Sequence, residues 1–219
     1  MGRQINSYKI STILPHAYNF QYNNNMLLYL IIIAIADTAI LLLNLHFNWL
    51  GVSEKQIILM SLLQPVLLIA ADGLAATILR WVIPVRFFTY KTKISHVSKT
   101  ECKIYEGLLI KHWKDHIIEL GMFTNFSKKS VANPNDRAYI ERFIMECNSG
   151  AWGHILGIIF GYAAILFFPR LYWPTIFIPA ACVNAVLSLL PFMILRYNLP
   201  RLHRLRNLLE KKESRHADK

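Results

Sequence analysis

One histidine and one glutamate near the start of an apolar run are the residues whose types suggest catalysis. His154 lies about one turn inside that run, and Glu146 lies two turns before it. An imidazole near a carboxylate is a common means of taking a proton from a hydroxyl group. We therefore expect His154 to be a general base and Glu146 to orient it; the alternative is that His154 only packs. Eight residues span ~12 Å of straight helix, so direct contact requires a bend at Gly150 or Gly153, or another group between them.

Acidic residues also occur inside apolar runs, where charge is costly. Asp37 and Asp72 each lie within such a run, and Asn184 lies within another. A carboxylate at the centre of a bilayer costs ~2.5–3.5 kcal/mol on insertion scales, so it normally faces other helices. Both carboxylates are therefore expected to face the bundle interior, near Gln64, near Asn184 or near each other. Hydrogen bonding between helices is one interpretation, and substrate binding or proton handling is the other.

Other catalytic signatures are missing or incomplete. His112 and His116 have the i, i+4 spacing of a metal pair, but no glutamate follows the first histidine as in zinc proteases. His96 is followed after five residues by Glu101, which departs from the His-x4-Asp motif of glycerolipid acyltransferases. The chain contains no GxSxG, phosphate-binding loop or dinucleotide fingerprint. We therefore expect neither a metal nor a cofactor.

The composition shows which elements must position these residues. Hydrophobic residues make up 54% of the 219-residue chain and charged residues 17%, against about 25% in soluble domains. The net charge is +11, but no nucleic-acid-binding motif accompanies it, so nucleic acid is not expected as a partner. In so apolar a chain, the basic residues are better explained by cytoplasmic segments that face anionic membrane lipids.

The apolar residues are concentrated in four runs, each about long enough to cross the ~30 Å hydrocarbon core as a helix. The sequence predicts an all-α integral membrane protein with one membrane domain over residues 1–219. The expected transmembrane helices cover about 26–45, 57–79, 151–168 and 171–195.

Two further segments are expected to lie at the membrane surface. In the segment 80–150, apolar spacing predicts an interfacial helix over 104–120, and Asn133 with Pro134 predicts the start of a helix that continues into the third run. The tail 196–219 is basic and amphipathic.

The positions of the basic residues predict the orientation. Residues 80–150 contain twelve lysines and arginines and the tail contains eight, whereas the short turns contain only Lys55 and Arg170. By the positive-inside rule, the central segment and both termini lie in the cytoplasm. We therefore expect a multi-pass protein of the cell membrane.

Four segments resemble the glycosyl-4,4'-diaponeurosporenoate acyltransferases of staphyloxanthin-type carotenoid biosynthesis. They are Trp113-Lys114-Asp115, residues 139–146 (YIERFIME), His154, and residues 196–202 (RYNLPRL). The similarity covers roughly residues 105–209. It departs from the family pattern at Ser149 and Ala151, where the family commonly has Arg and Glu, and after Asp115, where Leu-Pro is common.

The resemblance implies a small integral membrane enzyme that transfers a fatty acyl group to a sugar hydroxyl of a glycosylated carotenoid or lipid. The donor would be acyl-CoA or acyl carrier protein. We expect substrate binding by Trp113, Lys114, Asp115, Arg196, Asn198 and Arg201, with Lys114, Arg196, Asn198 and Arg201 holding an anionic donor. We expect a cavity near the membrane surface that His154 and Glu146 line. The alternative is a non-enzymatic membrane module, such as an assembly partner or a carrier subunit.

Overall fold

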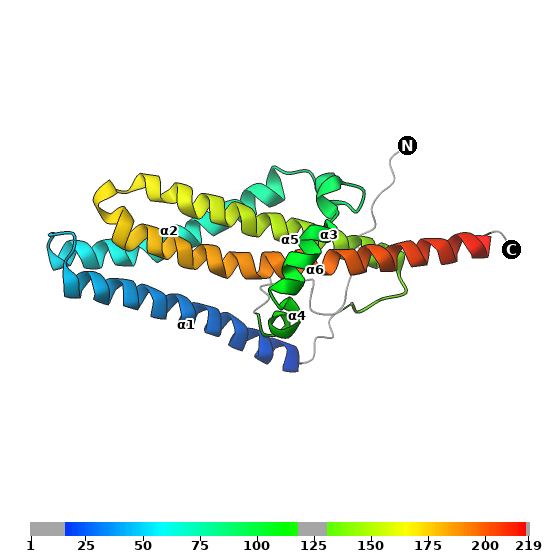
Figure 1. Cartoon of the computed structure of the whole chain (residues 1–219), viewed down its shortest axis with the longest axis horizontal. Helices are drawn as coiled ribbons and strands as arrows, with labels where there is room; N and C mark the ends of the chain where they lie inside the picture. Colours follow the sequence, from blue (N-terminus) through cyan, green and yellow to red (C-terminus); the bar gives the residue numbers. More distant parts are fainter. Residues whose placement is uncertain (1–15, 118–130, 218–219) are drawn as a thin grey trace.

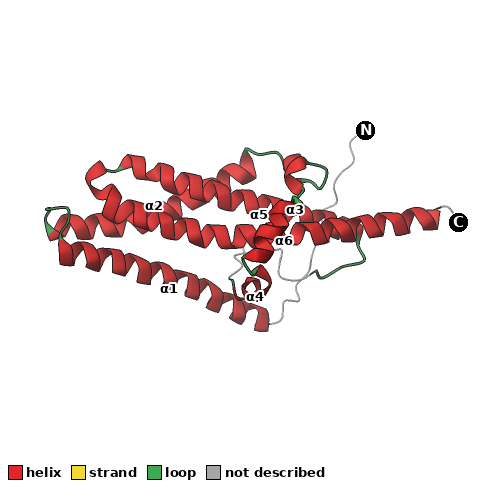
Figure 2. Cartoon of the chain, viewed as in Figure 1, coloured by secondary structure: helices red, strands yellow, loops and turns green. Residues whose placement is uncertain are grey.

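A computed structural model describes residues 16–117 and 131–217. Within these ranges the chain is helical and contains no strand. Four long helices dominate it, and Figures 1 and 2 show them side by side along the long axis of the molecule. They are α1 (His16–Phe47), α2 (Glu54–Trp81), α5 (Arg137–Ala164) and α6 (Ile178–Ala217). The most extensive contact is between α5 and α6, and α2 packs against α5.

The four helices alternate in direction, so the bundle has two different ends (Figure 1). At one end, which we call the turn end, residues 48–53 connect α1 to α2, and residues 165–177 connect α5 to α6. The first connection contains Gly51 at φ +60°, and Ser53 caps α2 together with Gln56. The second contains two 3-10 turns and a π-helical turn, Trp173–Phe177. The opposite end contains residues 82–117 and 131–136 and the last part of α6; we call it the basic end.

The outer faces of the bundle are apolar, as a lipid environment requires. Large side chains such as Leu62 and Val66 of α2 are more than 60% exposed. Four stretches are long and apolar enough to cross a membrane: Leu27–Phe47, Glu54–Trp81, Arg137–Phe167 and Arg170–His216. Exposed aromatic rings lie at both ends, with Trp81 at the basic end and Trp49 at the turn end. This arrangement is typical of membrane–water boundaries and confirms the predicted all-α fold class with four membrane-length helices.

Two buried clusters hold the helices together. At the basic end, α5 and α6 enclose a cluster made of Ile140, Phe143, Ile144, Cys147, Ala151, Leu195, Leu199 and Leu202. At the turn end, a second cluster joins α1, α2, the connection before α6 and the first turn of α6, and it includes Phe177. The first cluster fixes the α5–α6 pair at the level where the candidate site residues of both helices lie.

The prediction of a single helix over 104–120 is wrong for residues 104–117, and residues 118–120 lie outside the residues that the structure describes. Instead, α3 (Lys99–Gly107) ends at Leu108, and Leu109 adopts a left-handed conformation with φ +55° before the short α4 (Ile110–Trp113). The helix stops after Gly107, a poor helix former. The reversal buries Tyr105 and Ile110 while Ile104, Leu108 and Leu109 stay exposed, so the apolar residues do not form one stripe.

Helix boundaries elsewhere also differ from the expectation. The N-cap of α5 is Asp136, whose carboxylate accepts a hydrogen bond from the Tyr139 backbone, and not Asn133. The helix then continues without interruption through Ser149, Gly150 and Gly153. The fourth membrane helix and the basic tail are one element, because α6 continues past Pro191 and Pro200 to Ala217. Its last part extends beyond the other helices (Figure 1).

Candidate functional site

An ion pair at the basic end attaches the start of α3 to α6. The Arg196 guanidinium donates to both carboxylate oxygens of Glu101, at 2.8 and 2.9 Å, and the Tyr105 hydroxyl donates to the same carboxylate at 2.7 Å. Arg196 also donates to the backbone carbonyls of Ile94 and His96. Its side chain is only 14% exposed. Arg196, which we expected to hold an anionic donor, therefore has its donors committed within the protein.

The same contacts set the ionisation of the groups involved. Burial alone would raise the pKa of Glu101, but the hydrogen bonds from Arg196 and Tyr105 and the positive charge of Arg196 outweigh it and hold the pKa below its usual range. Burial, together with the hydrogen bond to the Glu101 carboxylate, raises the pKa of the Tyr105 phenol well above its usual range. The carboxylate stays charged and the phenol stays neutral at physiological pH.

A serine and a histidine form a second contact between the segment 82–98 and α6. The Ser95 Oγ lies 2.7 Å from His203 Nε2, and the Ser95 carbonyl oxygen lies 2.9 Å from the same nitrogen. The His203 ring stacks on His96 with ring centres 5.0 Å apart. A serine–histidine pair can be nucleophilic, but Ser95 is 0% exposed, so an acyl donor cannot reach it. This pair holds the segment in place.

The remaining residues expected to bind substrate lie near these contacts but do not form one cluster with them. The Trp113 indole donates to the Leu108 carbonyl at 2.9 Å, which closes the turn between α3 and α4. Lys114 is half-buried, and Asp115 is exposed just after α4. On α6, Asn198 is half-buried and Arg201 is exposed.

His154 and Glu146 are both half-buried on α5. Because α5 is helical throughout residues 137–164, their Cα atoms are separated by ~12 Å along its axis. The structure therefore does not bring the two side chains into direct contact. His154 instead lies next to Gly153, where an added Cβ would come 3.6 Å from the Leu79 side chain of α2. His154 therefore lies at the level of the last turn of α2, which contains Leu79.

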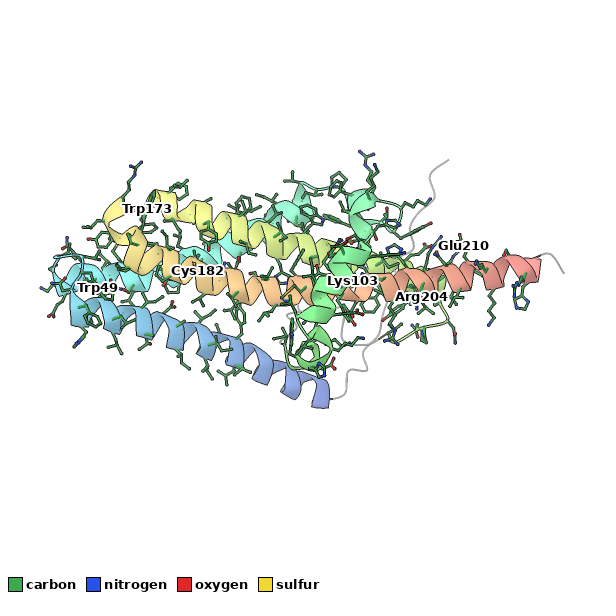
Figure 3. All side chains as sticks on the ribbon, in the orientation of Figure 1. Trp49, Lys103, Trp173, Cys182, Arg204 and Glu210 are labelled. Atoms are coloured by element: carbon green, nitrogen blue, oxygen red, sulfur yellow. The ribbon has the colours of Figure 1, made fainter. Side chains whose placement is uncertain are left out.

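Inside the bundle, the intramembrane polar residues share one cleft. It is formed by α1, α2 and α6, and its polar lining is Tyr29, Asp37, Gln64, Asp72 and Asn184. Asp37 lies beside Gln64, and Asp72 lies beside Asn184. His154 and Glu146 do not line this cleft. Figure 3 labels Cys182 on α6, the helix that contributes Ala180, Val183, Asn184 and Leu187 to this cleft.

Glycines of α5 close the back of this cleft. A Cβ at Gly157 would lie 2.6 Å from Asp72 Oδ1, and one at Gly161 would lie 3.1 Å from the Asn184 amide nitrogen. Real Cβ atoms essentially never come within 3.0 Å of such an atom. The missing side chain at Gly157 is therefore what allows the Asp72 carboxylate to lie directly against α5.

Sequence reasoning missed the role of several residues at the basic end. Glu101 was considered only as part of an incomplete motif, yet it is the partner of Arg196. The Ser98 side chain caps α3 by accepting a hydrogen bond from the Glu101 backbone N–H. A serine three residues before a glutamate is the sequence pattern that could have predicted a helix start here. In the residues that the structure describes, no group of three or more histidine, cysteine or acidic side chains has the arrangement of a metal site.

Comparison with known proteins identifies the class. Residues 84–208 match the family model of glycosyl-4,4'-diaponeurosporenoate acyltransferase, which is more than half of the chain. The fold and the basic end are thus those of a small helical protein from an acyltransferase family. The chain belongs to the glycosyl-4,4'-diaponeurosporenoate acyltransferase family. No curated protein and no solved structure matches it significantly.

The matched segment covers one part of the molecule described above. It contains the elements of the basic end, all of α5, and α6 up to residue 208, including the Glu101–Arg196 pair. The helices α1 and α2 lie before it, and with them Asp37, Gln64 and Asp72. The cleft is therefore built from Asn184 inside the matched segment and from carboxylates outside it.

Proposed function

We propose that this protein is a membrane O-acyltransferase that transfers a fatty acyl group to a hydroxyl of a glycosylated carotenoid or related glycolipid. The observation that supports this most directly is the family match over residues 84–208. The fold is consistent with it, because a lipid-soluble acceptor needs a protein whose helices lie in the membrane, and four helices have the required length and apolarity.

The donor, acyl-CoA or acyl carrier protein, approaches the basic end. Both donors are anionic, and exposed or half-buried cations at this end, Lys114 and Arg201 among them, would attract them. Asn198 and the Trp113 ring lie on the same elements and would contact the donor near the boundary. Asp115 would orient Lys114. Arg196 acts differently from the expectation, since it positions α3 on α6 through Glu101.

His154 serves as the base for the acceptor hydroxyl. Its imidazole takes the hydroxyl proton as the oxygen attacks the thioester carbonyl; the C–S bond then breaks, and the proton passes to the departing thiolate. Glu146 influences this step only through intervening groups, because the continuous helix keeps it ~12 Å away. Asp72 of α2 lies against Gly157, and Gly157 is ~4.5 Å from His154 along the axis of α5. Measured along that axis, Asp72 is therefore closer to His154 than Glu146 is.

In this proposal, the protein lies in the cell membrane as one domain, with the basic end and both termini in the cytoplasm. Membrane lipids surround the apolar outer faces, and the basic end lies at the leaflet whose anionic headgroups suit its charge.

Lipid and pigment analysis of a deletion strain tests the function in the cell. Loss of an acylated glycolipid, with accumulation of its unacylated precursor, is the expected result. Purified protein in vesicles should then transfer labelled palmitate from palmitoyl-CoA or palmitoyl-acyl carrier protein to that precursor. Unchanged lipids in the strain, with no transfer in vesicles, would instead support a non-enzymatic membrane module.

A further inference from the structure

The exposed face of the last part of α6 carries a row of cations. Its members follow one another at helical spacing, so they lie within about 100° of the helix circumference and extend over ~21 Å. All of them are exposed; five are basic, and the sixth is a leucine that is 59% exposed. We call this set the basic row: Arg201, Arg204, Leu208, Lys211, Lys212 and Arg215.

The acidic side chains of the same stretch lie on the opposite face of α6 and are already paired. Glu210 accepts from both terminal nitrogens of Arg206, at 2.7 and 3.0 Å. Glu213 lies 3.0 Å from the Arg137 guanidinium of α5. Among the residues that the structure describes, none of the five cations of the row forms an ion pair. The row therefore presents positive charge around one apolar side chain.

The row extends away from the bilayer along the bundle axis. The helix α6 is continuous, and its last part stays beside α5, where Arg206 pairs with Glu141 at 3.0 Å (Figure 1). Trp152, an exposed ring of α5 near the end of α2, suits the membrane boundary. From Trp152 to Arg137, the first residue of α5, the helix rises ~22 Å. A tail held along this length leaves the headgroup layer, so lipid can contact only the first cations of the row.

Charge complementarity calls for an acidic partner, and the rest of the chain does not supply one. Residues 1–15 contain two basic and no acidic residues, and residues 118–130 contain two lysines and one glutamate. A second copy packed row against row would be repelled. Coenzyme A has all its phosphates on one nucleotide, which reaches only neighbouring cations of a ~21 Å row. An acidic protein helix with an apolar side chain facing Leu208 matches its whole length.

We propose that the basic row docks an acidic carrier protein, so that the acyl group arrives on a protein and not on coenzyme A. This inference rests on the proposed function and selects between its two donors. Arg201, the first residue of the row, lies one turn after Asn198, which is expected to contact the donor. A carrier protein holds its acyl thioester on a flexible arm. It can therefore stay on the row while the thioester reaches the membrane boundary.

Docking can be measured without acyl transfer. The full-length protein is reconstituted in nanodiscs of phosphatidylcholine, and its affinity for fluorescent palmitoyl-acyl carrier protein is measured by microscale thermophoresis. The row variant combines Arg204→Glu, Lys211→Glu and Arg215→Glu, because single exposed ion pairs contribute little. Its affinity should fall at least about tenfold, since three attractions become three repulsions.

A second triple variant is the matched control. It combines Lys93→Glu, Lys99→Glu and Lys103→Glu, which are also exposed at the basic end and change the net charge equally. The control should bind the carrier protein as the wild type does. In vesicles, the row variant should raise KM for palmitoyl-acyl carrier protein at least about tenfold and leave KM for palmitoyl-CoA unchanged. Thermal melts test folding, and glutamine at the same three row positions provides a milder variant.

Contact with lipid is a separate outcome of the test. A fluorophore is attached through Arg215→Cys, in a background without Cys102, Cys147 and Cys182, and the protein is placed in nanodiscs that contain phosphatidylglycerol. Spin-labelled headgroups should leave its fluorescence unchanged, and the carrier protein should change it. Strong quenching by the headgroups would show that the row lies on the membrane and would overturn the inference.

Two binding results would also overturn it: equal loss of affinity in the row and control variants, or wild-type affinity in both row variants. Transfer assays separate this inference from the proposed function. Acyl transfer from palmitoyl-CoA without selective carrier binding would leave the enzyme and remove the docking site. Carrier binding on the row without transfer from either donor would retain the site and contradict the enzymatic function.

Discussion

The side chain of Arg196 lies in the segment that matches the family model and has a structural role. Its guanidinium connects Glu101 with the backbone carbonyls of Ile94 and His96, so one planar group joins three segments. Lysine has one ammonium group and cannot form this fork. The planar shape of Arg196 therefore matters as well as its charge.

Arg196→Lys should lower the free energy of unfolding by about 1–3 kcal/mol, because the bidentate contact and the carbonyl contacts are lost together. Arg201→Lys is the matched control, since Arg201 lies on the same helix and is exposed. Thermal melts in detergent measure both. Equal stability of the two variants would show that the fork contributes little.

The lowered pKa of Glu101 predicts a pH dependence. A carboxyl group whose pKa is lower in the folded than in the unfolded protein stabilises the fold above its unfolded pKa of about 4.3, and this contribution is lost as the pH falls through the folded pKa. The stability difference between wild type and Glu101→Gln should therefore be largest at neutral pH and shrink below about pH 4. Glu106→Gln, at an exposed position of the same helix, is the matched control variant.

His154 is the residue on which the proposed chemistry depends. His154→Gln should leave the protein inserted and folded but reduce acyl transfer by ~10²-fold or more, the usual effect of losing a general base. His112→Gln, at an exposed position of α4, should have a much smaller effect. Transfer rates in vesicles decide between base and packing residue: small, equal effects of the two substitutions would assign His154 to packing.

At the scale of elements, the contact between α2 and α5 depends on a missing side chain. Gly157→Ala would place a Cβ 2.6 Å from Asp72 Oδ1, and overpacking of this kind costs ~1–3 kcal/mol. Gly73→Ala on α2 is the control, because nothing lies within 4 Å of its added Cβ, and alanine is the better helix former.

The double variant Gly157→Ala/Asp72→Ala tests the cause. Truncating Asp72 removes the atom that the new methyl group would meet, so the double variant should be more stable than the sum of the single effects predicts. Simple additivity in thermal melts would mean that α5 adjusts elsewhere.

Element positions could be predicted from the sequence where one strong pattern dominated. The four apolar runs gave the four long helices because a membrane-length run has few alternatives. The break at Leu108 and Leu109 could not be predicted, because 104, 105, 108 and 109 also fit a helical stripe. Only the packing of Tyr105 and Ile110 in the interior decides against it.

The candidate site was less predictable for a related reason. Asp37, Asp72 and Asn184 could be singled out from the cost of polar groups in apolar runs, and they do line one cleft. Their neighbours depend on helix register across three elements, which local patterns do not contain. Glu101 and Arg196 are 95 residues apart in the chain, so nothing in the sequence paired them.

For the whole molecule, the charge distribution predicts topology. Single cysteines at Ser53 and Ser214, in a background without Cys102, Cys147 and Cys182, should be labelled from opposite sides of the membrane by an impermeant maleimide. The physical reason is that basic segments remain in the cytoplasm. Labelling from the same side would rule out the proposed orientation.

The length of α6 has a consequence for bilayer thickness. Its 40 residues span ~60 Å, about twice the hydrocarbon core, so the helix alone could slide along the membrane normal to suit a thicker or thinner bilayer. The packing of α6 against α5, together with the Glu101–Arg196 pair, fixes its position and so prevents sliding. Changes in thickness must then be met by tilting of the bundle or by deformation of the lipid. Activity should therefore vary with the acyl-chain length of the surrounding bilayer.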